Sequence, residues 1–212
     1  MTKNRDQLYR WALWLAWFTV FYNIVEGVVS VYFGFSDETL SLFGFGIDSF
    51  VEVISGIGIW HMLIRIKLHG EEKRDQFEKT ALKITGTSFY ILVAGLIVSA
   101  VYNTITNHKP QTAFWGIVIS IISIASMGLL IHYKKKIGTA LNSEALLADA
   151  NCTKTCLYLS IVLLLASVGY QITGFGGIDS FGALLIAYFS FREGKESFEK
   201  AKSDKYCSCE DD

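Results

Sequence analysis

Apolar residues gather into six long blocks along the chain, and short polar connections separate the blocks. Each block is close to the roughly 20 residues that a helix needs to cross the hydrocarbon core of a bilayer. The first block runs on without the short apolar core and small-residue cleavage site of a signal peptide, so we expect it to stay as a span. The pattern predicts six transmembrane helices, which cover about residues 9–33, 39–64, 84–106, 112–133, 143–170 and 176–194.

Six spans consume most of the 212 residues. This leaves no room for a soluble catalytic domain, so we expect an all-α membrane protein that is not an enzyme. We expect a six-helix transmembrane domain over residues 1–198, a short cytoplasmic tail over residues 199–212, and no cytoplasmic C-terminal domain after the last helix.

Basic residues fall on one side of the predicted membrane domain. Of the 19 Lys and Arg residues, 17 lie in the N-terminal segment, between Arg65 and Lys83, in the run 134–136, or in the segment 192–205. The positive-inside rule then predicts that both termini are cytoplasmic, in what we expect to be a bacterial inner membrane. The net charge of −1 reflects this sorting, and we expect no nucleic-acid partner.

Ionisable residues inside the predicted spans are costly and usually mark a transport path or a paired group. Asp48 and Glu52 lie four residues apart in the second span, on one helical face, and Cys152 and Cys156 do the same in the fifth. Because these two spans run in opposite directions, Asp48 and Cys152 both lie roughly 15 Å from a membrane surface. Two carboxylates and two thiols form a tetrahedral set of the kind that Zn²⁺, Cd²⁺ or Cu⁺ takes. Either cysteine alone would more often be a core residue.

The segments around these residues resemble two motifs of the cation diffusion facilitators. Residues 41–52 (SLFGFGIDSFVE) are similar to the second-helix motif, and residues 148–156 (ADANCTKTC) are similar to the fifth-helix motif. The resemblance extends to the sixth block and implies a six-helix, usually dimeric exporter that exchanges a divalent transition metal for protons. We therefore expect zinc as transported substrate and a homodimer in the bilayer.

Two departures from the family pattern change the expected selectivity and domain content. Cys152 and Cys156 stand where the family usually has His and Asp, which keeps four ligands but makes the site softer and leaves room for cadmium or another thiophilic metal. The usual cytoplasmic metal-sensing domain is not expected here. In this respect the chain resembles the small transmembrane protein 163-like branch of zinc transporters.

Several other residues have open roles at this level. Glu26 is either a proton carrier or access residue near the path, or a side chain that snorkels or pairs with Lys154. Asp149 either collects incoming cations or makes a hydrogen bond between helices. Lys154 projects away from the two cysteines and is expected to pair with an acid such as Asp179. The tail contains Cys207 and Cys209. It is either a loose metal-capturing segment or an inert terminus.

Two other classes of function fit the same pattern. A membrane-embedded metal sensor or scaffold would bind the cation without moving it. A cation channel would conduct without exchanging protons. Ligands at mid-depth favour the transporter over a sensor, because a sensor could place its ligands at a membrane surface at lower cost.

Overall fold

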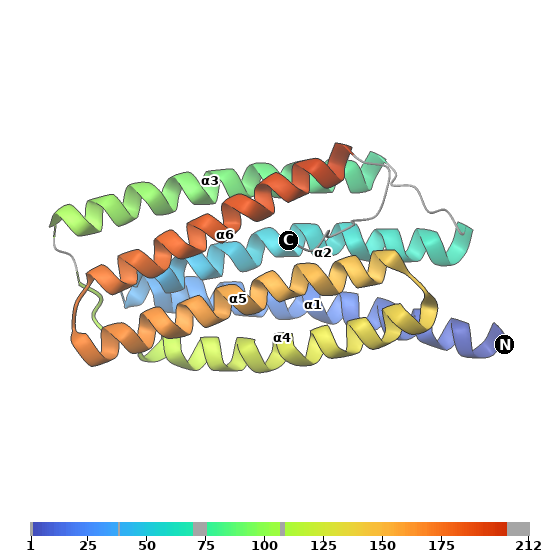
Figure 1. Cartoon of the computed structure of the whole chain (residues 1–212), viewed down its shortest axis with the longest axis horizontal. Coiled ribbons are helices and arrows are strands. Elements are labelled where there is room, and N and C mark those ends of the chain that lie inside the picture. The colour runs from blue at the N-terminus through green and yellow to red at the C-terminus, as the bar shows by residue number, and fades with distance from the viewer. Residues whose placement is uncertain (1, 38, 70–75, 107–108, 203–212) are drawn as a thin grey trace.

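The computed structural model describes residues 2–37, 39–69, 76–106 and 109–202 (Figure 1). Within these ranges the chain is helical and has no strand, which confirms the predicted all-α class. The helices are α1 (Thr2–Ser36), α2 (Leu40–His69), α3 (Gln76–Thr106), α4 (Phe114–Leu141), α5 (Glu144–Thr173) and α6 (Gly177–Lys202).

The described helices begin and end differently from the predicted spans. Helix α2 continues to His69 and α4 to Leu141, five and eight residues past the apolar blocks at 39–64 and 112–133. An apolar block ends where the side chains become polar, whereas a helix continues as long as its backbone hydrogen bonds are favourable.

Five of the described helices, α1 to α5, contain a stretch that is long and apolar enough to cross a membrane. These helices make the chain a multi-pass membrane protein. Helix α6 is not among the five because its 26 residues include many polar and charged positions, among them Asp179 and Glu193. A sixth crossing is therefore not established by length and hydropathy, although α6 packs within the bundle.

The helices run along one common axis and alternate in direction (Figure 1). The most extensive pairings are α1 with α2, α3 with α6, and α4 with α5, and α2 also packs against α5 and α6. One end of the bundle carries the α5–α6 turn and the other carries the N-terminus and the α4–α5 turn (Figure 1). Helix α2 is thus the element that can share a site with α1, α5 and α6.

Backbone turns and caps hold these ends together. Asn142 adopts a left-handed conformation after α4, and Gly174 does so after α5. The Asp179 carboxylate accepts hydrogen bonds from the backbone N–H of Leu40 (2.8 Å) and of Ser41 (3.1 Å), and from the Ser41 hydroxyl. An acid near a helix N-terminus satisfies N–H groups that have no partner within the helix, so Asp179 ties α6 to the start of α2.

Two glycines let α1 and α2 approach closely. A Cβ on Gly34 would lie 2.5 Å from the backbone nitrogen of Phe43, and a Cβ on Gly46 would lie 2.7 Å from that of Val31. Any larger side chain would force the two helices apart. Gly46 is two residues from Asp48, so this contact sets how near α1 lies to the predicted site.

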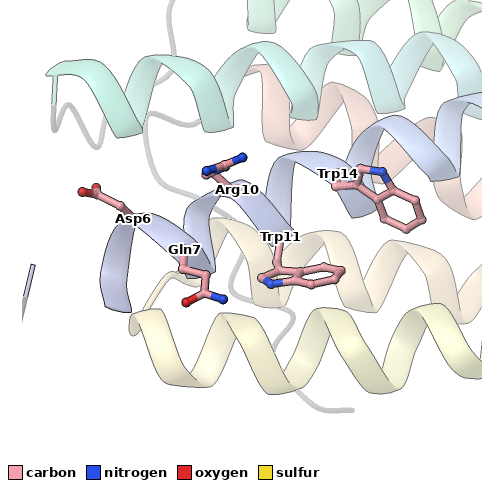
Figure 2. A pocket seen from close by; sticks show the side chains of 5 residues that line it. All are labelled: Asp6, Gln7, Arg10, Trp11 and Trp14. Atoms are coloured by element: carbon pink, nitrogen blue, oxygen red, sulfur yellow. The ribbon is translucent and has the colours of Figure 1, made fainter. Parts of the chain in front are cut away.

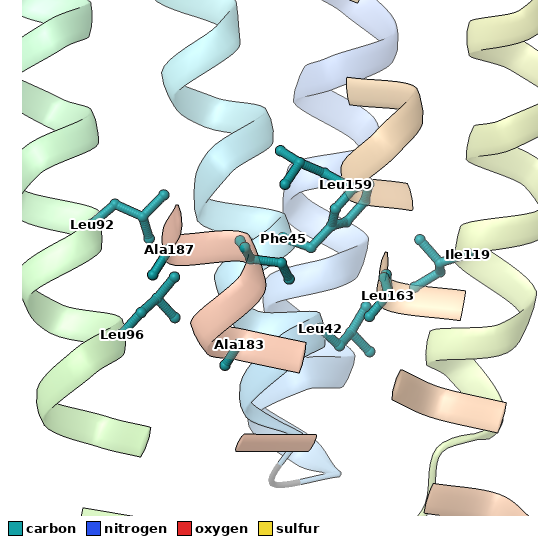
Figure 3. Packing of buried hydrophobic residues seen from close by; sticks show 10 residues of the cluster. Leu42, Phe45, Leu92, Leu96, Ile119, Leu159, Leu163, Ala183 and Ala187 are labelled. Atoms are coloured by element: carbon teal, nitrogen blue, oxygen red, sulfur yellow. The ribbon is translucent and has the colours of Figure 1, made fainter. Parts of the chain in front are cut away.

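Two apolar clusters fill the bundle, one toward each end. The first (Figure 3) lies toward the α5–α6 turn and contains Leu42, Phe45, Leu92, Leu96, Ile119, Leu159, Leu163, Ala183, Ile186 and Ala187. The second lies toward the α4–α5 turn and contains Ala12, Leu15, Ala16, Leu63, Met127, Leu130, Ile137, Leu141 and Leu146. Along every helix that contributes to both clusters, the residues between them include polar ones, so a polar layer separates two apolar layers.

Near the N-terminus, α1 presents tryptophans outward. Trp11 and Trp14 are exposed and line a hollow with Asp6, Gln7 and Arg10 (Figure 2). Aromatic rings beside a charged residue at the end of a spanning helix are typical of the membrane–water interface. This hollow does not involve the residues of the buried polar layer.

Candidate metal centre

The two acids of α2 enter the polar layer on one face of the helix. Asp48 is buried and its Oδ1 accepts a hydrogen bond from the Ser190 hydroxyl of α6 at 2.8 Å. Glu52 lies one turn further along and is half-buried. The negative charges of the two carboxylates act on each other, which is unfavourable unless a proton or a cation lies nearby.

Cys156 brings α5 to the same carboxylate. Its thiol donates a hydrogen bond to Oε1 of Glu52, across 104 positions of sequence. A thiol and a carboxylate from facing helices therefore lie in direct contact beside Asp48. Cys152 is part of α5, but its side chain lies outside the described residues, so its relation to the other three stays a prediction.

Among the side chains that the structure describes, no three His, Cys, Asp or Glu residues are arranged as a ready metal site. The contact between Glu52 and Cys156 is a hydrogen bond, and the thiol proton fills the space between the two ligand atoms. A cation would have to displace that proton before both groups could bind it.

Helix α6 contributes a third acid that the sequence analysis did not identify. Oε1 of Glu193 accepts a hydrogen bond from the Thr155 hydroxyl of α5 at 2.8 Å. The charge of Glu193 acts on Asp48, Glu52 and Cys156. The available signal was the spacing of Ser190 and Glu193, three residues apart and on one helical face.

Glu26 is 7 % exposed and lies among hydroxyl groups. Its carboxylate accepts hydrogen bonds from Tyr22 at 2.9 Å and Ser49 at 3.2 Å, and Ser123 of α4 faces the same group. A carboxylate enclosed in this way does not snorkel toward a membrane surface. The Ser123 hydroxyl also lies 2.8 Å from that of Ser160 on α5, so hydroxyl groups connect Glu26 with the helix that carries Cys156.

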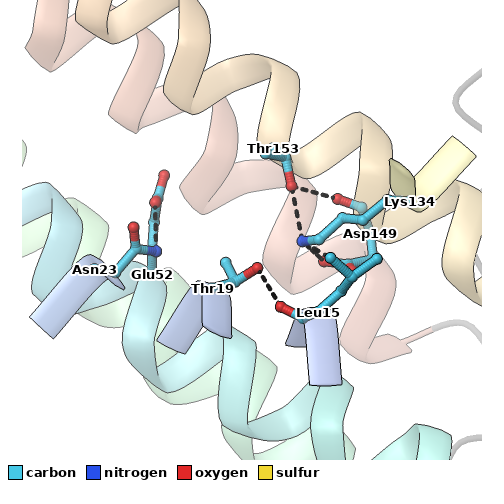
Figure 4. Close-up of polar contacts among 7 residues, drawn as sticks. All are labelled: Leu15, Thr19, Asn23, Glu52, Lys134, Asp149 and Thr153. Atoms are coloured by element: carbon cyan, nitrogen blue, oxygen red, sulfur yellow. Dashed lines mark hydrogen bonds and ion pairs between the residues drawn. The ribbon is translucent and has the colours of Figure 1, made fainter. Parts of the chain in front are cut away.

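Asn23, one turn before Glu26, is a second site residue that the sequence analysis did not identify. Its amide Nδ2 donates a hydrogen bond to Oε2 of Glu52 at 3.0 Å (Figure 4). Glu52 is thus held from two sides, by α1 through Asn23 and by α5 through Cys156. A neutral amide in an apolar block gives no charge signal, and only its position one turn from Glu26 could have drawn attention to it.

Asp149 lies in a buried ion pair between α4 and α5. The Lys134 ammonium is 2.9 Å from Oδ2 and 3.0 Å from Oδ1 of Asp149, and it also donates to the Thr153 hydroxyl at 3.0 Å (Figure 4). Of the two roles considered from the sequence, this geometry matches an interhelical contact. It also corrects one assignment, because Lys134 is 1 % exposed and is not part of the basic surface.

Lys154 and Asp179, which were expected as a possible ion pair, lie at different levels of the bundle. The hydrogen-bond partners described above for Asp179 are at the N-terminus of α2, whereas Lys154 lies on α5 next to Thr155 and far along the bundle from that end. Cys207 and Cys209 are outside the described residues.

Comparisons with known proteins identify the family of this chain and two distant relatives. The chain is 24 % identical over 139 residues to transmembrane protein 163 of Xenopus laevis, covering 65 % of this chain and 48 % of that protein. It is 27 % identical over 158 residues to an uncharacterized transporter of Methanocaldococcus jannaschii, covering 73 % of this chain and 55 % of that protein. The chain thus spans about half the length of these curated relatives. The family model of the cation efflux transmembrane domain matches residues 13–204, so the chain belongs to the cation efflux family.

Proposed function

We propose that this chain exports a divalent transition-metal cation in exchange for protons, through a site formed by Asp48, Glu52, Cys152 and Cys156. Zinc is the first candidate substrate, and cadmium or another thiophilic metal is the second. The observation that carries the proposal is the contact between the Cys156 thiol and the Glu52 carboxylate, beside the buried Asp48. Sulfur and carboxylate oxygen together suit a borderline metal better than Mg²⁺ or Ca²⁺.

The chemistry of this contact supports exchange for protons. The thiol proton is shared with Glu52, and both groups must be unprotonated to hold a cation. Binding of the cation therefore releases protons, and protonation from the opposite compartment releases the cation. Protonated ligands also avoid leaving bare negative charge in the membrane when the cation departs.

Access to the site would run through the neighbouring polar groups. Glu26 and its hydroxyl partners support a proton path between α1, α4 and α5. Glu193 supports a path along α6, since it interacts with both the site and the charged end of that helix. Asp149 borders this region, but it forms an ion pair with Lys134. We therefore assign Asp149 to the contact that holds α4 and α5 together.

The proposed topology has six crossings, including α6, with both termini in the cytoplasm of a bacterial inner membrane and a homodimer as the working unit. The distribution of basic residues supports the orientation, although the burial of Lys134 removes one residue from that count. Cys207 and Cys209 would capture cations near the cytoplasmic opening.

Transport into liposomes tests the function. The purified chain is reconstituted with a zinc-sensitive dye inside, and zinc is added outside with and without an imposed pH gradient. We expect zinc uptake that accelerates with the gradient and is lost in Asp48→Asn and Cys156→Ser. Glu199→Gln, which changes an exposed carboxylate paired with Lys195, is the matched control and should transport normally.

The outcomes separate the candidate functions. Zinc that binds without crossing the membrane would support a sensor or scaffold. Flux that ignores the pH gradient would support a channel. Unchanged, gradient-driven flux in both Asp48→Asn and Cys156→Ser would show that the cation does not use this site.

A further inference from the structure

Asn23 of α1 is buried against the proposed site, and only the nitrogen of its side-chain amide makes a hydrogen bond among the described residues. The side chain is 2 % exposed and directs Nδ2 to Oε2 of Glu52 at 3.0 Å (Figure 4). Its Oδ1 atom is buried and has no hydrogen-bond partner among the residues that the structure describes. Buried amide oxygens are nearly always paired with a donor or an ion, so this atom calls for a ligand.

Rotation of the amide about its last bond does not give Oδ1 a hydrogen-bond donor among the residues that the structure describes. The rotated group would place Oδ1 where Nδ2 now lies, 3.0 Å from a carboxylate oxygen of Glu52. Two acceptor oxygens at this distance repel each other. The hydrogen bond to Glu52 is therefore the favoured arrangement as long as nothing positively charged lies between the two residues.

A bound cation reverses this preference. Two oxygen ligands of one divalent cation, with metal–oxygen distances of about 2.1 Å and angles of about 90° to 109°, lie roughly 3.0 to 3.4 Å apart. The present separation of 3.0 Å between the Asn23 amide and Glu52 falls in that range. An amide oxygen and a carboxylate oxygen can thus share a cation here after a rotation of one side-chain bond.

We propose that Asn23 is a cation ligand contributed by α1, whose amide donates to Glu52 without the cation and turns its oxygen toward the cation when it binds. The inference rests on the proposed function, because it uses the same site. It adds a neutral oxygen to a set that otherwise carries negative charge, so it changes the coordination and hardness of the site without changing its charge.

A ligand on α1 also changes which helices respond to the cation. The four residues of the proposed site all lie on α2 and α5. With Asn23 included, three helices meet at the cation, and α1 is held to α2 by a metal–oxygen bond in place of a hydrogen bond. The close approach of α1 and α2 at Gly46 keeps this ligand within reach.

Cobalt binding to the purified full chain in detergent tests the proposal, because the visible spectrum of Co²⁺ reports its coordination. We compare Asn23→Leu, which removes both polar atoms at similar size, with Asn23→Asp, which keeps an oxygen and removes the donor. Asn103→Leu on α3 is the matched control. Zinc competition gives the affinity of each variant, and size-exclusion chromatography with far-UV circular dichroism checks folding.

We expect Asn23→Leu to lower the zinc and cobalt affinities by about 10-fold to 100-fold, comparable to the loss of a supporting metal-site group, and to change the Co²⁺ absorption bands. Asn23→Asp should bind more tightly than Asn23→Leu and keep a wild-type-like cobalt spectrum, whereas Asn103→Leu should behave like the wild type. If Asn23→Leu fails to fold, the metal affinity and cobalt spectrum of Asn23→Asp are compared with those of the wild type, and this comparison decides whether residue 23 supplies a ligand oxygen.

Four results would overturn the inference. Wild-type affinity in Asn23→Leu would show that the amide is not a ligand. Lower affinity with an unchanged cobalt spectrum would show that Asn23 only orients Glu52 by its hydrogen bond, as would loss of binding in Asn23→Asp. A wild-type chain that binds neither metal would instead reject the proposed function, and the inference with it.

Discussion

The ion pair between Lys134 and Asp149 gives the most quantitative stability prediction. Lys134 is 1 % exposed, Asp149 is 6 % exposed, and their closest charged atoms are 2.9 Å apart. At an effective dielectric constant of about 20, charges at this distance attract by about 5 to 6 kcal/mol, much of which offsets the cost of burying them. Removing one partner leaves the other charge buried without that compensation.

We therefore expect Lys134→Met and Asp149→Leu each to lower the free energy of unfolding by about 3–5 kcal/mol. The double variant places two apolar side chains of similar size together, and its stability should lie within about 1 kcal/mol of the wild type or above it. Unfolding is followed by far-UV circular dichroism as SDS is added to detergent micelles. Lys195→Met, which removes a charge from an exposed ion pair, should change stability by less than about 0.5 kcal/mol.

The reasoning fails if the double variant is as unstable as the worse single variant, because the two charges would then not depend on each other. The same set of proteins tests whether Asp149 collects cations. A stable double variant that transports zinc at the wild-type rate agrees with a structural ion pair. A stable double variant with much weaker zinc transport would return Asp149 to the cation path.

Three further predictions concern the helix contacts around the site. Asp179→Ala should lower the unfolding free energy by about 1–2 kcal/mol, because the first N–H groups of α2 lose their acceptor, and the SDS titration measures this. Gly46→Ala should destabilise the bundle by about 1–3 kcal/mol in the same titration, since its Cβ would collide with α1, whereas Gly95→Ala, with open space around it, should not. Thr155→Val should slow proton-driven zinc uptake by about 10-fold in liposomes, because Glu193 loses its hydrogen-bond donor, and an unchanged rate would exclude Glu193 from the path.

The sequence was sufficient to predict α1 to α5 because their apolar blocks are long and uniform. It was less informative on where they end, since α2 and α4 continue into polar segments as helices. It also could not establish whether α6 crosses the membrane. That helix contains acids and serines that face other helices, and their burial depends on the assembled bundle.

For the site, the sequence could predict groups that share one helix. The spacing of Asp48 and Glu52 places both on one face of α2. Predicting contacts between helices required an assumed membrane depth for each residue. In the structure, Glu52 contacts Cys156 and Asp48 contacts Ser190. Lys134 was assigned to the surface from its neighbours in a lysine run, because its partner is fifteen residues away on another helix.

The order of layers along the bundle has an electrical consequence. A membrane that stores energy as a proton gradient discharges if an unbroken file of water crosses it, and here apolar side chains lie on both sides of the polar layer. If the chain exchanges cations for protons as proposed, opening one cluster while the other stays closed would let the central groups exchange with one compartment at a time. In that mechanism, the tightness of proton coupling would depend on apolar residues of the two clusters, such as Leu42, Leu163, Met127 and Leu146, as well as on the proposed cation ligands.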